Sequence, residues 1–322
     1  MIQDQLTPFE EDTPWAYVRG LHSGSLCDWP GLVTAVLFLG GCNLRCPTCH
    51  NAGLAWTPER YPPLTQTHIQ DFLHSRSGWL DGLVVSGGEP TFVPGLPSLL
   101  QELSFFGLPL KVDTNGLRPD ILESLLAEGT IQAVAVDVKG PWSKYPLLTG
   151  GRCSPAQAQQ ALESVFRLAK AYPQTFFFRC TAVPELSPRD LEQVQELSFF
   201  GLPLKVDTNG LRPDILESLL AEGTIQAVAV DVKGPWSKYP LLTGGRCSQV
   251  QAQQSLEAVF RLAQAHPQTF FFRCTAVPEL SPRDLEEVQE LVPSGFSLSV
   301  QTYIPPQQAE KGANIGPGIS NF

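Results

Sequence analysis

Three cysteines, Cys42, Cys46 and Cys49, lie on one short segment with a C-x3-C-x2-C spacing. Three thiolates at this spacing can bind three corners of a cubane iron–sulfur cluster and leave the fourth iron open to a further ligand. A structural zinc site would need a fourth protein ligand, for which His50 is available. The segment therefore predicts a cluster site, with zinc as the alternative; the glycines before it and the proline within it argue against plain core cysteines.

A second candidate for chemistry is the segment Ser86–Pro90, which contains Gly87, Gly88 and Glu89. Two adjacent glycines allow the backbone to approach a ligand closely, and Glu89 adds a carboxylate. The same residues are also compatible with an ordinary turn at the end of a strand. The segment follows the first predicted strand after the cysteine loop. This position favours a functional site over an ordinary turn, because barrel enzymes build their sites at the carboxyl ends of the strands.

The elements that must position these residues alternate between strands and helices. Continuous apolar runs, typical of parallel strands covered on both faces, predict the strands. They are 32–39, 82–86, 108–112, 131–138, 175–181, 202–206, 225–232, 269–275 and 297–303. Helical patterns lie between them, clearest at 121–126 and 161–168, and Ser187 with Pro188 begins another helix. This alternation predicts βαβ units and a parallel sheet.

A long repeat decides the layout of the chain. Residues 103–196 recur as residues 197–290, with 87 of 94 positions identical. The pattern is typical of one tandem duplication, which keeps three βα units in phase, and not of a solenoid with many diverged repeats. Without one copy the chain would have about 228 residues, the size of a single domain.

The composition is globular: 322 residues, 43% of them hydrophobic, with a net charge of −10. The acidic balance argues against a nucleic acid or an anionic membrane as a partner held by charge. The first residues lack the features of an export signal, and the longest apolar run, 32–39, is too short to span a bilayer. We therefore expect a cytoplasmic protein whose eight cysteines are ligands or buried thiols, not disulfides.

These motifs resemble those of the radical S-adenosylmethionine (SAM) superfamily. The three cysteines match its cluster triad, and Gly87-Gly88-Glu89 matches its motif for the SAM amino group. Within the superfamily the chain is similar to the activating enzymes of glycyl-radical proteins, above all those of anaerobic ribonucleoside-triphosphate reductases. Four segments carry this narrower resemblance: Asp28-Trp29-Pro30-Gly31, Cys49-His50-Asn51, Asp113-Thr114-Asn115-Gly116 and Asp137-Val138-Lys139.

The resemblance implies an α/β fold, an open parallel (βα) barrel with a 4Fe–4S cluster at its mouth. Such an enzyme cleaves SAM with an electron from a flavodoxin- or ferredoxin-like donor, and the resulting deoxyadenosyl radical abstracts a hydrogen atom. In an activating enzyme that atom comes from a glycine of a partner, expected here to be an anaerobic ribonucleotide reductase. This chemistry requires a dry, closed pocket.

The resemblance also implies roles for five further residues. Asp113, Thr114 and Asp137 are similar to residues that surround SAM and a bound monovalent cation in some activating enzymes. Lys139 and Arg179 are expected to meet the SAM carboxylate through charge-assisted hydrogen bonds. The alternatives are ordinary: Asp-Thr-Asn-Gly is also a good turn sequence, and the two cations are compatible with solvated strand ends.

Two features depart from the family pattern. Thr48 stands where an aromatic residue usually packs near the adenine, which leaves that packing open. The last strand, 297–303, lacks a histidine expected in some activating enzymes, which weakens the choice of subgroup but not of superfamily.

The repeat duplicates part of the predicted site. The cysteine loop and the Gly-Gly-Glu segment occur once, whereas Asp113, Asp137, Lys139 and Arg179 recur as Asp207, Asp231, Lys233 and Arg273. We expect the first copy to serve the site, because its first strand closely follows the Gly-Gly-Glu strand and local contacts cost little loop-closure entropy. We expect the second copy to enlarge the barrel into a continuous arc of up to nine parallel strands, since a detached lobe would expose an apolar sheet face. The alternative is that the second copy completes the barrel and the first bulges out.

The predicted organisation has four parts. They are an N-terminal extension at 1–19, a radical SAM core with the first copy at 20–196, the second copy at 197–290, and a last strand with a tail at 291–322. Two alternatives to a glycyl-radical activating enzyme remain. One is a radical SAM enzyme that acts on a small molecule, as the deazapurine synthases do. The other is a non-catalytic product of a disrupted or misassembled gene, which the near-identity of the copies suggests.

Overall fold

The computed structural model describes residues 13–302, except 174, 182, 184, 188, 191, 192, 195–203, 222 and 224. These residues form two compact units, the first ending at Phe177 and the second beginning at Phe178. The predicted tail after the last strand lies outside the described residues, as do most of the N-terminal extension and the start of the second copy. The four-part organisation predicted from the repeat stays a prediction.

The first unit contains a sheet in which β1 alone runs antiparallel. Strand β2 (Thr34–Leu39) pairs in parallel with β3 (Gly82–Gly87), β3 with β4 (Leu110–Thr114), and β4 with β5 (Ala133–Asp137). Strand β1 (Val18–Ser25) is antiparallel to β2. It was not predicted, because its polar and glycine-rich sequence carries little apolar signal.

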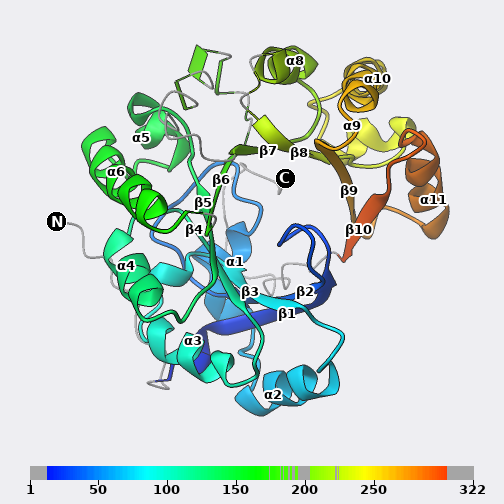
Figure 1. Ribbon diagram of the computed structural model, residues 1–322. Coiled ribbons are helices and arrows are strands. Elements are labelled where there is room, and N and C mark those ends of the chain that lie inside the picture. Colours follow the sequence, from blue (N-terminus) through cyan, green and yellow to red (C-terminus); the bar gives the residue numbers. More distant parts are fainter. Residues whose placement is uncertain are drawn as a thin grey trace, which may run out of the picture. The chain divides into compact units, whose positions relative to one another are not determined.

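Helices α2, α3, α4 and α6 lie along the outer side of these strands (Figure 1). The helices of this unit are α1 (Ala52–Trp56), α2 (Gln66–Ser75), α3 (Leu96–Ser104), α4 (Pro119–Ala127), α5 (Tyr145–Leu148) and α6 (Pro155–Ala171), and the short 3-10 turns are η1 (Pro14–Tyr17), η2 (Pro58–Arg60), η3 (Pro90–Phe92) and η4 (Trp142–Lys144). Leucines such as Leu99 in α3 and Leu122 in α4 are fully buried. Burial of one such side chain contributes about 1.5–3 kcal/mol, which explains why the strands and the inner helix faces are both apolar.

The second unit is built from parallel strands. Strand β6 (Phe176–Thr181), which begins at the boundary, pairs with β7 (Leu204–Thr208), β7 with β8 (Ile225–Asp231), β8 with β9 (Phe270–Ala276), and β9 with β10 (Leu298–Thr302). Its helices are α8 (Pro213–Ala221), α9 (Tyr239–Leu242), α10 (Gln249–Ala265) and α11 (Pro282–Leu291), with the 3-10 turn η5 (Trp236–Lys238). The predicted α/β class with parallel strands is therefore confirmed within each unit.

The two copies of the repeat form the same elements. Strands β4 and β7 correspond, as do helices α4 and α8, and helices α6 and α10. The helix start predicted at Ser187 and Pro188 lies partly outside the described residues, but its copy begins α11: Ser281 caps this helix, with a capping box to Asp284 and a proline in the first turn. Local sequence therefore determines these elements independently of what surrounds each copy.

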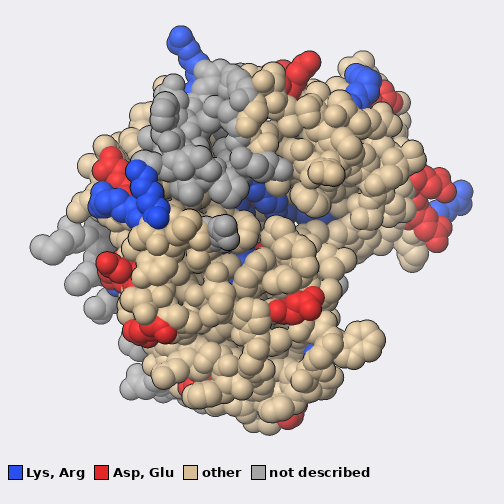
Figure 2. Space-filling model, in the orientation of Figure 1, with Lys and Arg blue, Asp and Glu red and all other residues tan. Residues whose placement is uncertain are grey.

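Charged side chains of both signs are interspersed on the face of the molecule shown in Figure 2. Two exposed ion pairs occupy equivalent positions in the two copies: Arg118 with Asp120, and Arg212 with Asp214. Pairs this exposed contribute little to stability. Within the described ranges, none of the helices has the length and apolar content that a membrane crossing requires.

Candidate functional site

The cysteine loop runs from the end of β2 to the start of α1. Its thiols are partly buried. The backbone N–H of Cys49 donates to the carbonyl oxygen of Cys46 (3.0 Å), and the N–H of Leu44 donates to the sulfur of Cys42 (3.3 Å). These two hydrogen bonds order the segment that carries the three cysteines.

Burial raises the pKa of all three thiols, and that of Cys42 reaches about 12. The negative charge of Glu89 adds to the rise at Cys42, whereas Lys139 lowers the pKa of Cys46 and Cys49 and so opposes the effect of burial. The thiols are consequently protonated at neutral pH, and a bound metal must displace the protons. Over the described part of the chain, these cysteines included, no group of three His, Cys, Asp or Glu side chains is arranged to hold a metal ion.

The two glycines after β3 are required by close packing against the end of β2. A Cβ atom on Gly87, whose φ is +120°, would lie 2.3 Å from both the backbone nitrogen and oxygen of Leu39. A Cβ atom on Gly88 would lie 1.9 Å from the carbonyl oxygen of Gly41, which accepts a 2.8 Å hydrogen bond from the N–H of Glu89. The two glycines therefore allow the Gly-Gly-Glu turn to lie against the backbone just before Cys42, and the predicted close approach to a ligand stays a prediction.

The carboxylate of Glu89 is 1% exposed and joins the ends of β3 and β4. It accepts hydrogen bonds from Thr91 N–H (3.1 Å) and hydroxyl (2.6 Å), from the Thr114 hydroxyl (2.6 Å) and from Asn115 N–H (2.7 Å). Burial raises its pKa even though all four donors favour the charged form. Three of the four donors bind Oε1 and only one binds Oε2, so the carboxylate keeps an acceptor position at Oε2.

Asp113 lies on β4 with its side chain buried against Lys111, with which it forms an ion pair. Lys111 was not among the predicted site residues, although a lysine within an apolar strand run is a visible signal. Burial of both partners of a pair is expected when each neutralises the other. Because Lys111 supplies a positive charge beside Asp113, the geometry lends the predicted monovalent cation no support.

Asp137 is the last residue of β5 and Lys139 lies two positions after it, with Lys139 Nζ 3.3 Å from Asp137 Oδ2. The backbone N–H of Lys139 donates to the hydroxyl of Tyr145 (3.1 Å), which fixes the turn. The charge of Lys139 lowers the pKa of the Cys46 and Cys49 thiols against the larger, opposite effect of burial. Arg179, on β6, belongs to the second unit, and its predicted role stays a prediction.

The duplicated residues of the second unit pair with one another. Arg273 on β9 lies 2.9 Å from Asp207 on β7 and 2.5 Å from Asp231 on β8. Lys205 adds a further ion pair of 3.5 Å to Asp207. The second copy therefore carries a compact salt-bridge cluster at the carboxyl ends of its strands.

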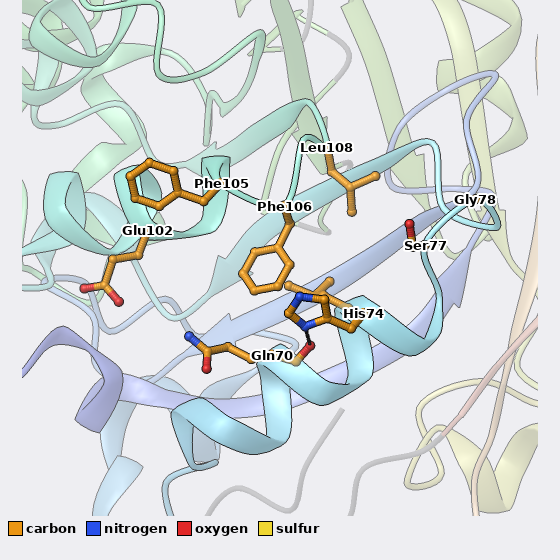
Figure 3. A pocket seen from close by; sticks show the side chains of 9 residues that line it. Gln70, His74, Ser77, Gly78, Glu102, Phe105, Phe106 and Leu108 are labelled. Atoms are coloured by element: carbon orange, nitrogen blue, oxygen red, sulfur yellow. Dashed lines mark hydrogen bonds between the residues drawn. The ribbon is translucent and has the colours of Figure 1, made fainter.

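A separate cavity of about 430 Å³ lies between α2 and the segment that joins α3 to β4 (Figure 3). His74 and Phe106 meet edge to face in its wall, with ring centroids 5.0 Å apart, and Glu102 lies at its other end. None of the predicted site residues lines it. The cavity is therefore distinct from the site at the cysteine loop.

Comparison with known proteins places the chain in a family. The model of the radical SAM superfamily matches residues 36–198, half of the chain. A Methanocaldococcus jannaschii protein, named provisionally as a glycyl-radical enzyme activating enzyme, is 33% identical over 184 residues, which are 56% of this chain and 74% of that protein. The 7-carboxy-7-deazaguanine synthase of Hyperthermus butylicus is 35% identical over 91 residues, which are 28% of this chain and only 37% of that enzyme.

Among solved structures, anSMEcpe with bound AdoMet and a Cp18Cys peptide overlaps 65% of this chain and 60% of its own, at 18% identity and a TM-score of 0.43. That overlap is too loose to support any argument about the site. The match to the superfamily model is different, because it includes the cysteine loop, the Gly-Gly-Glu turn and the ends of β4 and β5. The family implies a 4Fe–4S cluster and SAM as cofactors. The chain belongs to the radical SAM superfamily and is a radical SAM enzyme.

Proposed function

We propose that this enzyme generates a glycyl radical on a partner enzyme. The observation that carries the proposal is the relative named as an activating enzyme, which matches over 74% of its own length. The deazaguanine synthase matches over 37% of its length, which supports a small-molecule substrate as the second candidate. The partner we expect is an anaerobic ribonucleoside-triphosphate reductase, and the electron donor a flavodoxin- or ferredoxin-like protein.

The donor set of the cysteine loop fits a 4Fe–4S cluster. A bound cluster would supply the electron for reductive cleavage of SAM to methionine and a deoxyadenosyl radical, which would take a hydrogen atom from the glycine. Cys42, Cys46 and Cys49 would hold it, because three thiols on one loop leave one iron open. Burial raises the pKa of each, so these residues give up protons as the cluster assembles, and the loop must bring their sulfur atoms to their final positions.

Apart from Arg179 on β6, the residues proposed to bind SAM lie at or just after the carboxyl ends of β3, β4 and β5. We propose that the SAM amino group meets the turn Gly87-Gly88-Glu89, where the Glu89 carboxylate accepts three hydrogen bonds at Oε1 and only one at Oε2. Lys139 and Arg179 are proposed to meet the SAM carboxylate, since cations bind carboxylates by charge-assisted hydrogen bonds. The remaining predicted residues, Asp113, Thr114 and Asp137, are proposed to line the same site.

We propose that the first copy of the repeat serves this site and that the second enlarges the parallel sheet. Two contacts support the first copy: Thr114 and Asn115 both donate to Glu89, in the unit that holds the thiols. The copies of the predicted acids, Asp207 and Asp231, share Arg273. Resequencing the gene across the repeat junction tests whether the duplication exists; a single copy would remove this part of the proposal and leave the first unit as described.

The proposed activity is tested by electron paramagnetic resonance. The reconstituted enzyme is incubated anaerobically with SAM, reduced flavodoxin and an anaerobic ribonucleotide reductase. We expect the signal of a glycyl radical on the reductase with the native chain and none with Cys46→Ala. Cleavage of SAM without radical formation on any glycyl-radical enzyme, together with turnover of the deazaguanine synthase substrate, would establish the second candidate instead.

A further inference from the structure

We infer that the first copy of the repeat clamps the cysteine loop at two points outside the cluster ligands, Asn43 and Arg45. The side-chain N–H of Asn115 donates to Oδ1 of Asn43 (2.8 Å), and the backbone N–H of Arg45 donates to the carbonyl oxygen of Thr149 (3.2 Å). Both clamped residues lie between Cys42 and Cys46. The inference rests on the proposed function in that the loop is the one proposed to hold the cluster.

Asn115 is suited to the first contact because its backbone N–H, its side-chain oxygen and its side-chain NH2 group have one defined partner each. Its backbone N–H donates to Glu89, and its side-chain oxygen accepts the N–H of Leu117 (3.0 Å). The amide orientation is thereby fixed, since the oxygen is used in the turn and only the NH2 group can face Asn43. One buried residue thus connects the Gly-Gly-Glu turn with the cysteine loop.

The second contact depends on a glycine. Gly150 has a φ of +63°, and a Cβ atom there would lie 2.2 Å from the carbonyl oxygen of Arg45. Any side chain at this position would push the loop away from the segment after α5. Arg45 transmits the contact within the loop, because its guanidinium donates to the carbonyl oxygens of Cys42 (2.9 Å) and Leu44 (3.0 Å).

The repeat provides matched controls within the same chain. Asn209 occupies the position of Asn115 and makes the same turn, accepting the N–H of Leu211 at 3.1 Å. Gly244 occupies the position of Gly150 with a similar φ of +57°. The cysteine loop has no second copy in the sequence, so substitutions at Asn209 and Gly244 repeat the local change without the contact to the loop.

Hydrogen–deuterium exchange of residues 41–50 in the cluster-free chain tests the clamp. We expect Asn115→Ala and Gly150→Ala to speed exchange in this segment at least tenfold, because each removes a contact that orders it. We expect Asn209→Ala and Gly244→Ala to change it less than twofold. Equal effects of the paired substitutions, or none from Asn115→Ala, would overturn the inference.

Two further measurements keep the outcome decisive. If Asn115→Ala does not fold, Asn43→Ala removes the same hydrogen bond from the side of the loop. Where both fold, the double variant should exchange in residues 41–50 no faster than Asn43→Ala alone. In reconstituted protein, a chelator should strip iron from Asn43→Ala at least tenfold faster than from Asn209→Ala; equal rates would contradict the clamp. The exchange experiment uses neither cluster nor SAM, so it tests the clamp even if the proposed activity is not found.

Discussion

Gly88→Ala is the substitution that most sharply tests how the Gly-Gly-Glu turn supports the cysteine loop. The added Cβ atom would lie 1.9 Å from the carbonyl oxygen of Gly41 and 2.6 Å from its carbonyl carbon, both backbone atoms. Real Cβ atoms essentially never approach closer than 3.0 Å. The chain before Cys42 must therefore move by more than an ångström, because no flexible side chain is available to give way.

The cost can be assembled from two contributions. Overpacking of a tight site typically costs about 1–3 kcal/mol. The same movement breaks the hydrogen bond from Glu89 N–H to Gly41, whose net contribution is about 1 kcal/mol. We expect a loss of about 2–4 kcal/mol in the free energy of unfolding. Because functional groups tolerate displacements of only about 0.5 Å, we also expect cluster loading to fall at least tenfold.

The assay combines urea unfolding of the cluster-free chain with iron and sulfide analysis after anaerobic reconstitution. Gly24→Ala is the neutral control, because a Cβ atom there meets nothing within 4 Å. Gly129→Ala controls for backbone strain, because the φ of Gly129 is +69° but its surroundings are open. This variant should lose about 1–2 kcal/mol of the free energy of unfolding and bind as much iron as the native chain. The reasoning is refuted if Gly88→Ala unfolds like Gly24→Ala and binds iron like the native chain.

Three other perturbations follow from the same structure. Because burial raises the pKa of the three cysteine thiols, the fraction of thiolate grows with pH until the pH reaches that pKa. The rate of cluster assembly should therefore rise between pH 7 and 9, by up to roughly tenfold per pH unit. A rate that does not change with pH would contradict the burial of Cys42 and its neighbours. Asp113→Ala should lower 5′-deoxyadenosine formation at least tenfold and Asp207→Ala less than twofold, whereas equal losses would contradict the assignment of the site to the first copy. Arg273→Gln should destabilise the second unit by about 1.5–3 kcal/mol without changing iron content, and an unchanged unfolding midpoint would count against the salt-bridge cluster.

The parts of the site that could be predicted from the sequence are short motifs whose residues lie close together in the chain. Cys42, Cys46 and Cys49 are recognisable because three ligands within eight residues must share a loop. Most strands begin one or two residues after the apolar run that predicts them, as with β2 at Thr34, because bounds drawn from a sequence pattern and bounds drawn from hydrogen bonding differ by one or two residues. Strand β1 shows the limit, since its sequence has no apolar pattern and its pairing with β2 alone defines it.

The contacts that organise the site could not be predicted, because they depend on the register of neighbouring strands. Glu89 is visible as a carboxylate, but two of its four hydrogen bonds, from Thr114 and Asn115, form only when β3 and β4 pair. The bond from Asn115 to Asn43 joins residues 72 positions apart. The ion pair of Lys111 could have been predicted, since a charged residue in an apolar strand must either have a partner or lie outside the core.

Reductive cleavage of SAM by the anaerobically reconstituted chain is the most direct test of the central claim. The account predicts iron and sulfide in the amounts of one 4Fe–4S cluster, and 5′-deoxyadenosine that appears only with SAM and a reductant. It also predicts that Cys46→Ala loses both the cluster absorbance and the product. Zinc in place of iron, or a full cluster that yields no 5′-deoxyadenosine, would contradict it.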